Sequence, residues 1–277
     1  MPASARERFA QLLDASNNDF DLAEAALLIA QEEQPHLDVA AYLQRLDALA
    51  DQVRAHVPEP QTPAATLTQL NKLLFEEERL SGNATDYYDP RNSFLNEVLD
   101  RKIGIPITLS VIYMEVGRRL GMNIFGVGFP GHFLVKYSGP DGEVILDPFH
   151  GGVTLSREQL AQKLREMYGE GNPFLTQIPQ LLTPASKREI LVRMLRNLKG
   201  VYLQKNDFPR ALNAIDRIVL VDPTIAAEFR DRGAVHQRLG RLQAAAQDFR
   251  RYLQMEPQAP DAQAIRGMIA RTTAQLN

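Results

Sequence analysis

The chain has 277 residues and a formal net charge of −3, which allows two modest domains and provides no basic surface for a nucleic-acid partner. It contains no cysteine, so disulfides, thiolate metal sites and thiol nucleophiles are excluded. The N-terminal segment MPASARERFAQLLDAS has no apolar signal-peptide core, and no apolar run approaches the length of a membrane span. We therefore expect a soluble, cytoplasmic protein without a membrane partner.

The N-terminal part of the chain predicts helices joined by a rigid connector. Apolar residues recur every three or four positions over 20–35, 37–57 and 66–80, a spacing that favours amphipathic helices. Pro35 ends the first of them. The proline-punctuated segment VPEPQTP, residues 57–63, is typical of a connector rather than an element.

The central part, about 81–152, predicts a helical pair followed by a small antiparallel sheet. Pro106 suits a first helical turn and Gly121 suits a helix end. The patterns predict helices over 94–104 and 106–121, strands over 123–129, 132–137 and 143–147, and a turn at 138–142. This order of elements indicates the α+β class.

The C-terminal part carries an internal period of 34 residues. Small, apolar and proline residues recur in register at Leu195 and Phe229, Tyr202 and His236, Ala211 and Ala245, Ile215 and Phe249, Pro223 and Pro257, and Gly233 and Gly267. This period is similar to that of tetratricopeptide repeats, with small residues at the helix crossings. We expect an all-α domain over 185–277, made of two repeats and a capping helix over 264–276, after a first domain over 1–180.

His132 and Asp147 begin and end two neighbouring predicted strands. A histidine and an aspartate so placed make two members of a catalytic triad. They meet only if they share a sheet face, which the predicted turn permits and a one-residue slip forbids. We expect a hydrogen bond between them, and a structural, a ligand-binding and a residual catalytic role all stay open.

The central block resembles the transglutaminase-like fold of the papain-like cysteine protease superfamily. In that superfamily a cysteine opens a buried helix, a glycine closes the helix fifteen residues later, and a histidine and an aspartate follow on successive strands. Here Gly121 places Pro106 at the cysteine position, and His132 and Asp147-Pro148 match the other two members. The resemblance implies a relic of the triad, with no catalytic residue expected, because proline has no nucleophile.

Two hydroxyls of the same helix are the nearest substitutes for that nucleophile. Thr108 projects from another side of the helix than Pro106, and Ser110 shares its face but lies a turn deeper, about 6 Å away. A serine on a packed helix ordinarily bonds the backbone. We expect that role for Ser110.

Longer runs resemble a bacterial family of invasion-regulator (Sir B-type) proteins, in which a transglutaminase-like domain is joined to tetratricopeptide-like repeats. The resemblance rests on LNKLLFEEERLSGNATDYYDPRNSFLNEVLDRKIGIPITLS, GVGFPGHFLVKY, LDPFHGG, REILVRMLRNLKGVYL and RDRG. It covers nearly the whole chain and implies that the Gly-Ile-Pro sequence is a family feature. It implies no reaction.

A polar loop before the helical pair is the other candidate binding element. Its side chains can form turns and helix caps or line a binding surface, and both interpretations stay open for Asn83, Asp86, Tyr87, Tyr88, Asp89 and Asn92. His150 joins His132 as a candidate binding residue. Two histidines and Asp147 suit a metal, but nothing else nearby has ligand spacing, so we expect no metal site and no cofactor.

These observations favour a non-catalytic binding or regulatory protein, a pseudoenzyme whose groove and repeats engage a protein or peptide partner. The first alternative is a hydrolase or amidase in which His132 acts as a base on a bound water or with a metal. The second alternative is a structural subunit whose repeats mediate assembly.

Overall fold

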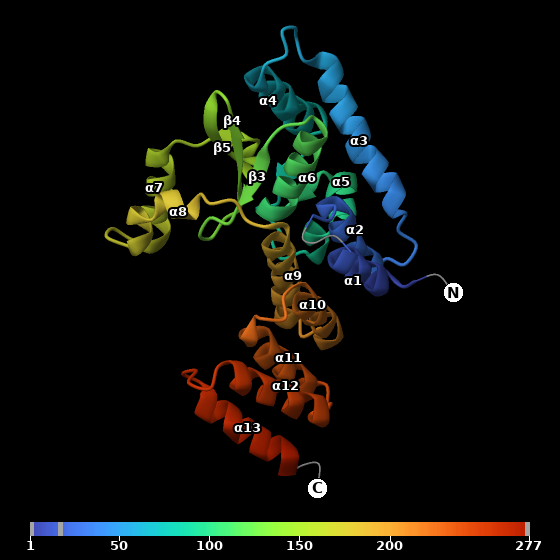
Figure 1. The fold of residues 1–277 in the computed structure, drawn as a ribbon, viewed down its shortest axis with the longest axis vertical. Coiled ribbons are helices and arrows are strands. Elements are labelled where there is room, and N and C mark those ends of the chain that lie inside the picture. Colours follow the sequence, from blue (N-terminus) through green and yellow to red (C-terminus); the bar gives the residue numbers. More distant parts are fainter. Residues whose placement is uncertain (1–2, 16–18, 275–277) are drawn as a thin grey trace. The chain divides into compact units, whose positions relative to one another are not determined.

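The computed structural model describes residues 3–15 and 19–274, and the chain divides into two compact units, Met1–Ile190 and Leu191–Asn277. Figure 1 labels the α-helices and the strands β3, β4 and β5. The helices of the first unit are α1 (Ala5–Ala15), α2 (Leu22–Glu33), α3 (Val39–His56), α4 (Pro63–Asn71), α5 (Leu95–Arg101), α6 (Pro106–Arg119), α7 (Arg157–Tyr168) and α8 (Ile178–Leu181). Its strands are β1 (Ser81–Gly82), β2 (Ile103–Gly104), β3 (Ile124–Val127), β4 (Leu134–Gly139), β5 (Gly142–Asp147) and β6 (Val153–Thr154).

The predicted N-terminal helices are confirmed as α2 and α3, and each begins at an aspartate cap. The Asp21 side chain accepts a hydrogen bond from the Glu24 amide at 2.9 Å, and Asp38 does the same for Ala41 at 3.1 Å. The helix predicted over 66–80 is wrong at both ends. It starts at Pro63, which Thr62 caps, and from Lys72 to Glu77 it continues as a π-helix. Because residues 57–63 were interpreted as a connector, Thr62 and Pro63 were not recognised as the start of this helix.

The larger sheet is an antiparallel meander in the order β3-β4-β5-β6. Gly139 pairs with Gly142, so the turn between β4 and β5 is shorter than the predicted 138–142. The predicted strand over 132–137 is also wrong at its start, because β4 begins at Leu134 and His132 lies in the preceding turn. Strands β1 and β2, which the sequence did not predict, pair in parallel through Gly82 and Gly104.

Helices cover the larger sheet on both faces (Figure 1). Helix α6 packs closely on one face, where a Cβ on Gly117 would lie 2.4 Å from Ile124 Cδ1. The other face shares an apolar core with α7 and α8; this core contains Val127, Phe129, Leu134, Ile145, Leu155, Leu160, Leu164, Ile178 and Leu182. The sheet is thus a rigid layer that fixes the positions of the turns at its edge.

The second unit is all-helical and confirms the expected repeats. Its helices are α9 (Lys187–Gln204, which starts just before the unit boundary), α10 (Phe208–Val221), α11 (Ala226–Arg238), α12 (Leu242–Met255) and α13 (Ala262–Ala274). Ala211 and Ala245, the predicted crossing residues, are fully buried. A Cβ on Gly233 of α11 would lie 3.2 Å from the Ala245 carbonyl oxygen, so α11 and α12 approach closely there. Among the described helices, none combines the length and the apolarity that crossing a membrane requires.

Candidate functional site

Asp147, the last residue of β5, is the centre of the candidate site. Its side chain is fully buried. Pro148 starts a short 3-10 turn, η3 (Pro148–His150), because its fixed φ suits the first helical position. Gly151 and Gly152 then adopt φ values of 75° and 73°, which non-glycine residues rarely adopt. The 3-10 turn itself brings His150 back to the carboxylate of Asp147, and the two glycines let the chain leave the turn afterwards.

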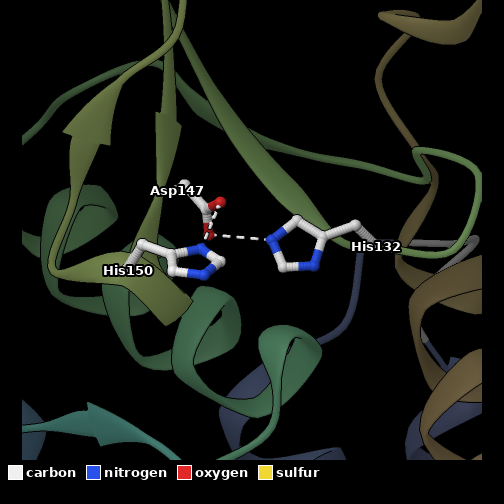
Figure 2. A group of neighbouring side chains, drawn as sticks. All are labelled: His132, Asp147 and His150. Atoms are coloured by element: carbon white, nitrogen blue, oxygen red, sulfur yellow. Dashed lines mark hydrogen bonds and ion pairs between the residues drawn. The ribbon is translucent and has the colours of Figure 1, made fainter. Parts of the chain in front are cut away.

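His132 reaches the same carboxylate from the turn before β4. Gly131 has a φ of 68°, and the His132 amide donates to the Phe129 carbonyl at 3.0 Å. The His132 Nε2 lies 2.8 Å from Asp147 Oδ1, so the predicted hydrogen bond is confirmed. Figure 2 shows the imidazole ring directed at the carboxylate. This hydrogen bond joins the turn before β4 to the last residue of β5.

The second carboxylate oxygen is bonded to His150. His150 Nδ1 lies 2.8 Å from Asp147 Oδ2, and Figure 2 shows both imidazole rings converging on Asp147. Burial by itself would raise the pKa of the Asp147 carboxyl, but the hydrogen bonds and charges of His132 and His150 outweigh it, and the net pKa lies below its ordinary value. Lys163 of α7 adds positive charge, with its Nζ 4.0 Å from Oδ2. The carboxylate is therefore held ionised between basic groups.

Helix α6 begins at Pro106, the residue that the sequence analysis aligned with the cysteine of the superfamily. The Thr108 hydroxyl accepts a hydrogen bond from the Ile105 amide at 3.2 Å and donates to the Asn92 carbonyl at 2.8 Å. The buried Ser110 hydroxyl donates to the Phe133 carbonyl at 3.5 Å, which confirms its expected backbone role. Both hydroxyls are thus engaged in structural contacts.

The polar loop divides into side chains that hold the loop and side chains that face solvent. The fully buried Asn92 donates to the Asp86 carbonyl at 2.7 Å, and Asn83 Oδ1 accepts from the Asp86 amide at 2.9 Å. Tyr87 and Tyr88 are 40% and 56% exposed, with ring centroids 5.5 Å apart. Asn83 and Asn92 therefore serve the turn through their side chains and Asp86 through its backbone, whereas the tyrosines form its surface.

Asp89 closes this loop on two arginines. Its carboxylate caps the following 3-10 turn, η2 (Pro90–Ser93), by accepting from the Arg91 amide at 2.9 Å, and it also pairs with Arg101 at 3.3 Å. Burial alone would raise the pKa of Asp89, but the hydrogen bonds from Arg91 and the charge of Arg101 lower it below its ordinary value. Asp89 is thus a structural anchor of the loop.

Phe149 connects the loop to the histidines, and the sequence analysis missed it. Its ring lies edge-on to His132 and His150, with centroids 5.9 Å and 5.1 Å away. Gly82, next to the start of the loop, packs directly on the ring. The sequence offered one signal for this role. Phe149 follows directly on Pro148, and a residue inside a short turn has a restricted position. Nothing in the sequence indicated Lys163, because its contact with Asp147 depends on how α7 packs against the sheet.

Comparisons with known proteins agree with this two-part architecture. The family model described as Transglutaminase-like superfamily matches residues 40–196, and a tetratricopeptide repeat model matches residues 198–270. The chain is 40% identical to a UPF0162 protein of Xylella fastidiosa (strain 9a5c) over 92% of this chain and 91% of that one. It is 28% identical to a UPF0162 protein of Vibrio cholerae over 93% and 96%, and 24% identical to UPF0162 protein YchA of Escherichia coli K12 over 93% and 95%. The predicted joining of the two kinds of domain is confirmed.

Proposed function

The chain belongs to the transglutaminase-like superfamily and to the UPF0162 protein family, and from this premise we propose that its first domain binds a protein or peptide without acyl-transfer chemistry. In this proposal the domain is a pseudoenzyme with a regulatory role, and the tetratricopeptide-like repeats add a second contact for the partner. The cytoplasmic location stays a prediction.

The observation that carries the proposal is the start of α6. Acyl transfer by this fold requires a nucleophile that attacks a carbonyl, and the resemblance aligns Pro106, the first residue of α6, with that nucleophile. The neighbouring hydroxyls of Thr108 and Ser110 are engaged with backbone carbonyls. An unactivated hydroxyl held in this way is a poor nucleophile, so binding is the better supported function.

Tyr87 and Tyr88 support a binding surface at the polar loop. Exposed tyrosines on a stiff loop provide contact area at a small cost in conformational entropy, and aromatic residues are enriched at interfaces. The loop is stiff because Asn92 and Asp89 hold it from the buried side. Because a protein or peptide partner would contact the tyrosines, we assign them the principal binding role.

The experiment captures partners on the full-length chain and compares two variants. A double variant, Tyr87→Ser with Tyr88→Ser, should lose a partner that the wild type retains, as identified by mass spectrometry and confirmed with purified protein. Tyr168→Ser is the matched control, because Tyr168 is 46% exposed on α7. A partner lost equally from the control, or from neither variant, would contradict the proposal.

The His132–Asp147 pair favours a second candidate, hydrolysis of an amide or ester by an activated water. A histidine oriented by a buried carboxylate is the usual form of a general base. The proposals differ in turnover: the binding role predicts no glutamine–amine cross-linking and no peptide or ester hydrolysis. Reproducible turnover by the wild type that His132→Ala abolishes would favour the hydrolase.

A further inference from the structure

The Asp147 carboxylate binds a different histidine with each oxygen. Oδ1 lies 2.8 Å from His132 Nε2, and Oδ2 lies 2.8 Å from His150 Nδ1. A catalytic dyad uses one histidine, whose other nitrogen faces the substrate. The second histidine is therefore unnecessary for that arrangement, and it brings another imidazole nitrogen to the same point.

The spacing of these atoms suits a single metal ion. One donor atom from each of the three residues can be chosen so that all lie within 4.8 Å of one another. Ligand atoms bonded to zinc at about 2.0–2.2 Å in a tetrahedron lie roughly 3.4 Å apart. The three donor atoms therefore lie near the spacing that a single ion requires.

The cluster is open on one side. The Asp147 side chain is fully buried and that of His132 is 14% exposed, whereas that of His150 is 53% exposed. An ion could enter past His150, and solvent could supply a further ligand. Three protein ligands with an open position is the composition of zinc sites that keep a bound water.

We propose that His132, Asp147 and His150 bind one first-row divalent transition-metal ion of the zinc class. Two imidazole nitrogens favour such ions over Mg²⁺ and Ca²⁺, which prefer oxygen ligands. The ion takes the place of the two ring protons that now face the carboxylate, so binding releases protons or shifts the tautomers. The sequence predicted no metal here, because it could not show that η3 turns His150 onto the carboxylate that His132 binds.

The surroundings of the cluster both support and oppose the ion. Phe149 packs edge-on against both imidazoles and restricts their rotation. Lys163 places a positive charge 4.0 Å from Oδ2, which repels a cation. Its side chain is 33% exposed, so it can swing into solvent when the ion enters. Removal of this charge should therefore tighten metal binding.

The test uses the full-length protein without a histidine tag and Zn²⁺ alone, measured by isothermal titration calorimetry. We expect one equivalent bound by the wild type, and binding at least about tenfold weaker for His132→Gln and for His150→Gln. Lys163→Gln should bind more tightly. His56→Gln is the matched control, since His56 is exposed on α3 and bonds only the Gln52 carbonyl among the described contacts. It should bind as the wild type does.

A spectroscopic arm identifies the coordination. With Co²⁺ as the probe, the wild type should give visible absorption bands of four- or five-coordinate intensity, and the two histidine variants should not. Circular dichroism confirms that each variant is folded. The proposal is overturned if the wild type takes up no saturable equivalent of Zn²⁺, or if His132→Gln and His150→Gln bind it unchanged. Because the assay contains metal alone, such a result would leave the proposed partner binding by Tyr87 and Tyr88 untouched.

Discussion

Gly82 lies against the aromatic ring of Phe149, the residue that separates the two turn-forming neighbours Pro148 and His150. A Cβ at position 82 would lie 2.6 Å from the Phe149 ring and 2.7 Å from the Phe149 carbonyl oxygen. The oxygen belongs to the backbone and cannot rotate away. The shape of η3, and with it the position of His150, thus depends on the absence of a side chain at Gly82.

The first prediction follows from this contact. Gly82→Ala should lower the free energy of unfolding by about 1–3 kcal/mol through overpacking, as measured by urea denaturation. It should also weaken Zn²⁺ binding, because η3 must shift. Gly200→Ala is the control, since Gly200 lies inside α9 with nothing within 4 Å of its Cβ position. The control should gain about 0.5–1 kcal/mol, and a loss as large as that of Gly82→Ala would contradict the argument.

The second prediction compares the two histidines as stabilising partners of Asp147. Measured in EDTA, His132→Ala should cost about 1–3 kcal/mol, because its hydrogen bond satisfies a buried carboxylate. His150→Ala should cost less than about 1 kcal/mol, because the ring is half exposed and its ion pair is screened by solvent. Chemical denaturation of the two variants measures the difference. Equal losses would mean that burial of the ring does not decide the contribution.

The third prediction concerns two glycines that occupy the same place in successive repeats. A Cβ on Gly233 would lie 2.8 Å from the Phe249 ring and 3.2 Å from the Ala245 carbonyl, whereas one on Gly267 would meet nothing within 4 Å. Gly233→Ala should therefore destabilise the protein by about 1–3 kcal/mol. Gly267→Ala should stabilise it by up to about 1 kcal/mol, because alanine favours a helix interior. Thermal unfolding of both variants checks the opposite signs.

The fourth prediction concerns pH and His236 of α11. Its Nδ1 is buried without a hydrogen-bond partner in the described structure. Burial lowers its pKa below the ordinary value and outweighs the opposing charges of Asp248 and Asp216. Between the lowered pKa and the ordinary value of about 6.5, the unfolded chain binds more protons than the folded chain. Above about pH 6.5, His236 is neutral in both states and does not reduce the free energy of unfolding. As the pH falls below that value, protonation of the unfolded chain lowers the free energy of unfolding.

The measurement for His236 is the unfolding free energy at pH 7.5 and at pH 5.5. The wild type should lose more stability between these values than His236→Gln, which has no titrating group at this position. The four other histidines are common to both proteins and cancel in the comparison. An identical loss in the two proteins would show that His236 does not contribute to the pH dependence.

Most of the architecture could be predicted from the sequence, because the relevant patterns are local, but the pairing of β1 with β2 could not. Apolar residues every three or four positions predict the helices, and Pro106 and Gly121 mark the ends of one of them. The 34-residue period predicts the repeats independently of the rest of the chain. The His132–Asp147 contact was also predictable, because a hairpin with a short turn joins the two residues. Where a start signal was misinterpreted, as at Thr62 and Pro63, the predicted bounds were wrong.

How the side chains share their surroundings could be seen only in the folded chain. His150 bonds Asp147 because the 3-10 turn η3 brings a residue three positions on back to the carboxylate, and Lys163 reaches the same carboxylate from a separate helix. Gly233 and Gly267 are equivalent in the repeat period but differ in the space around them, because a following helix packs on only one of them at that point. The space around Gly233 depends on Phe249 and Ala245 of the following helix, a packing contact that no local pattern encodes.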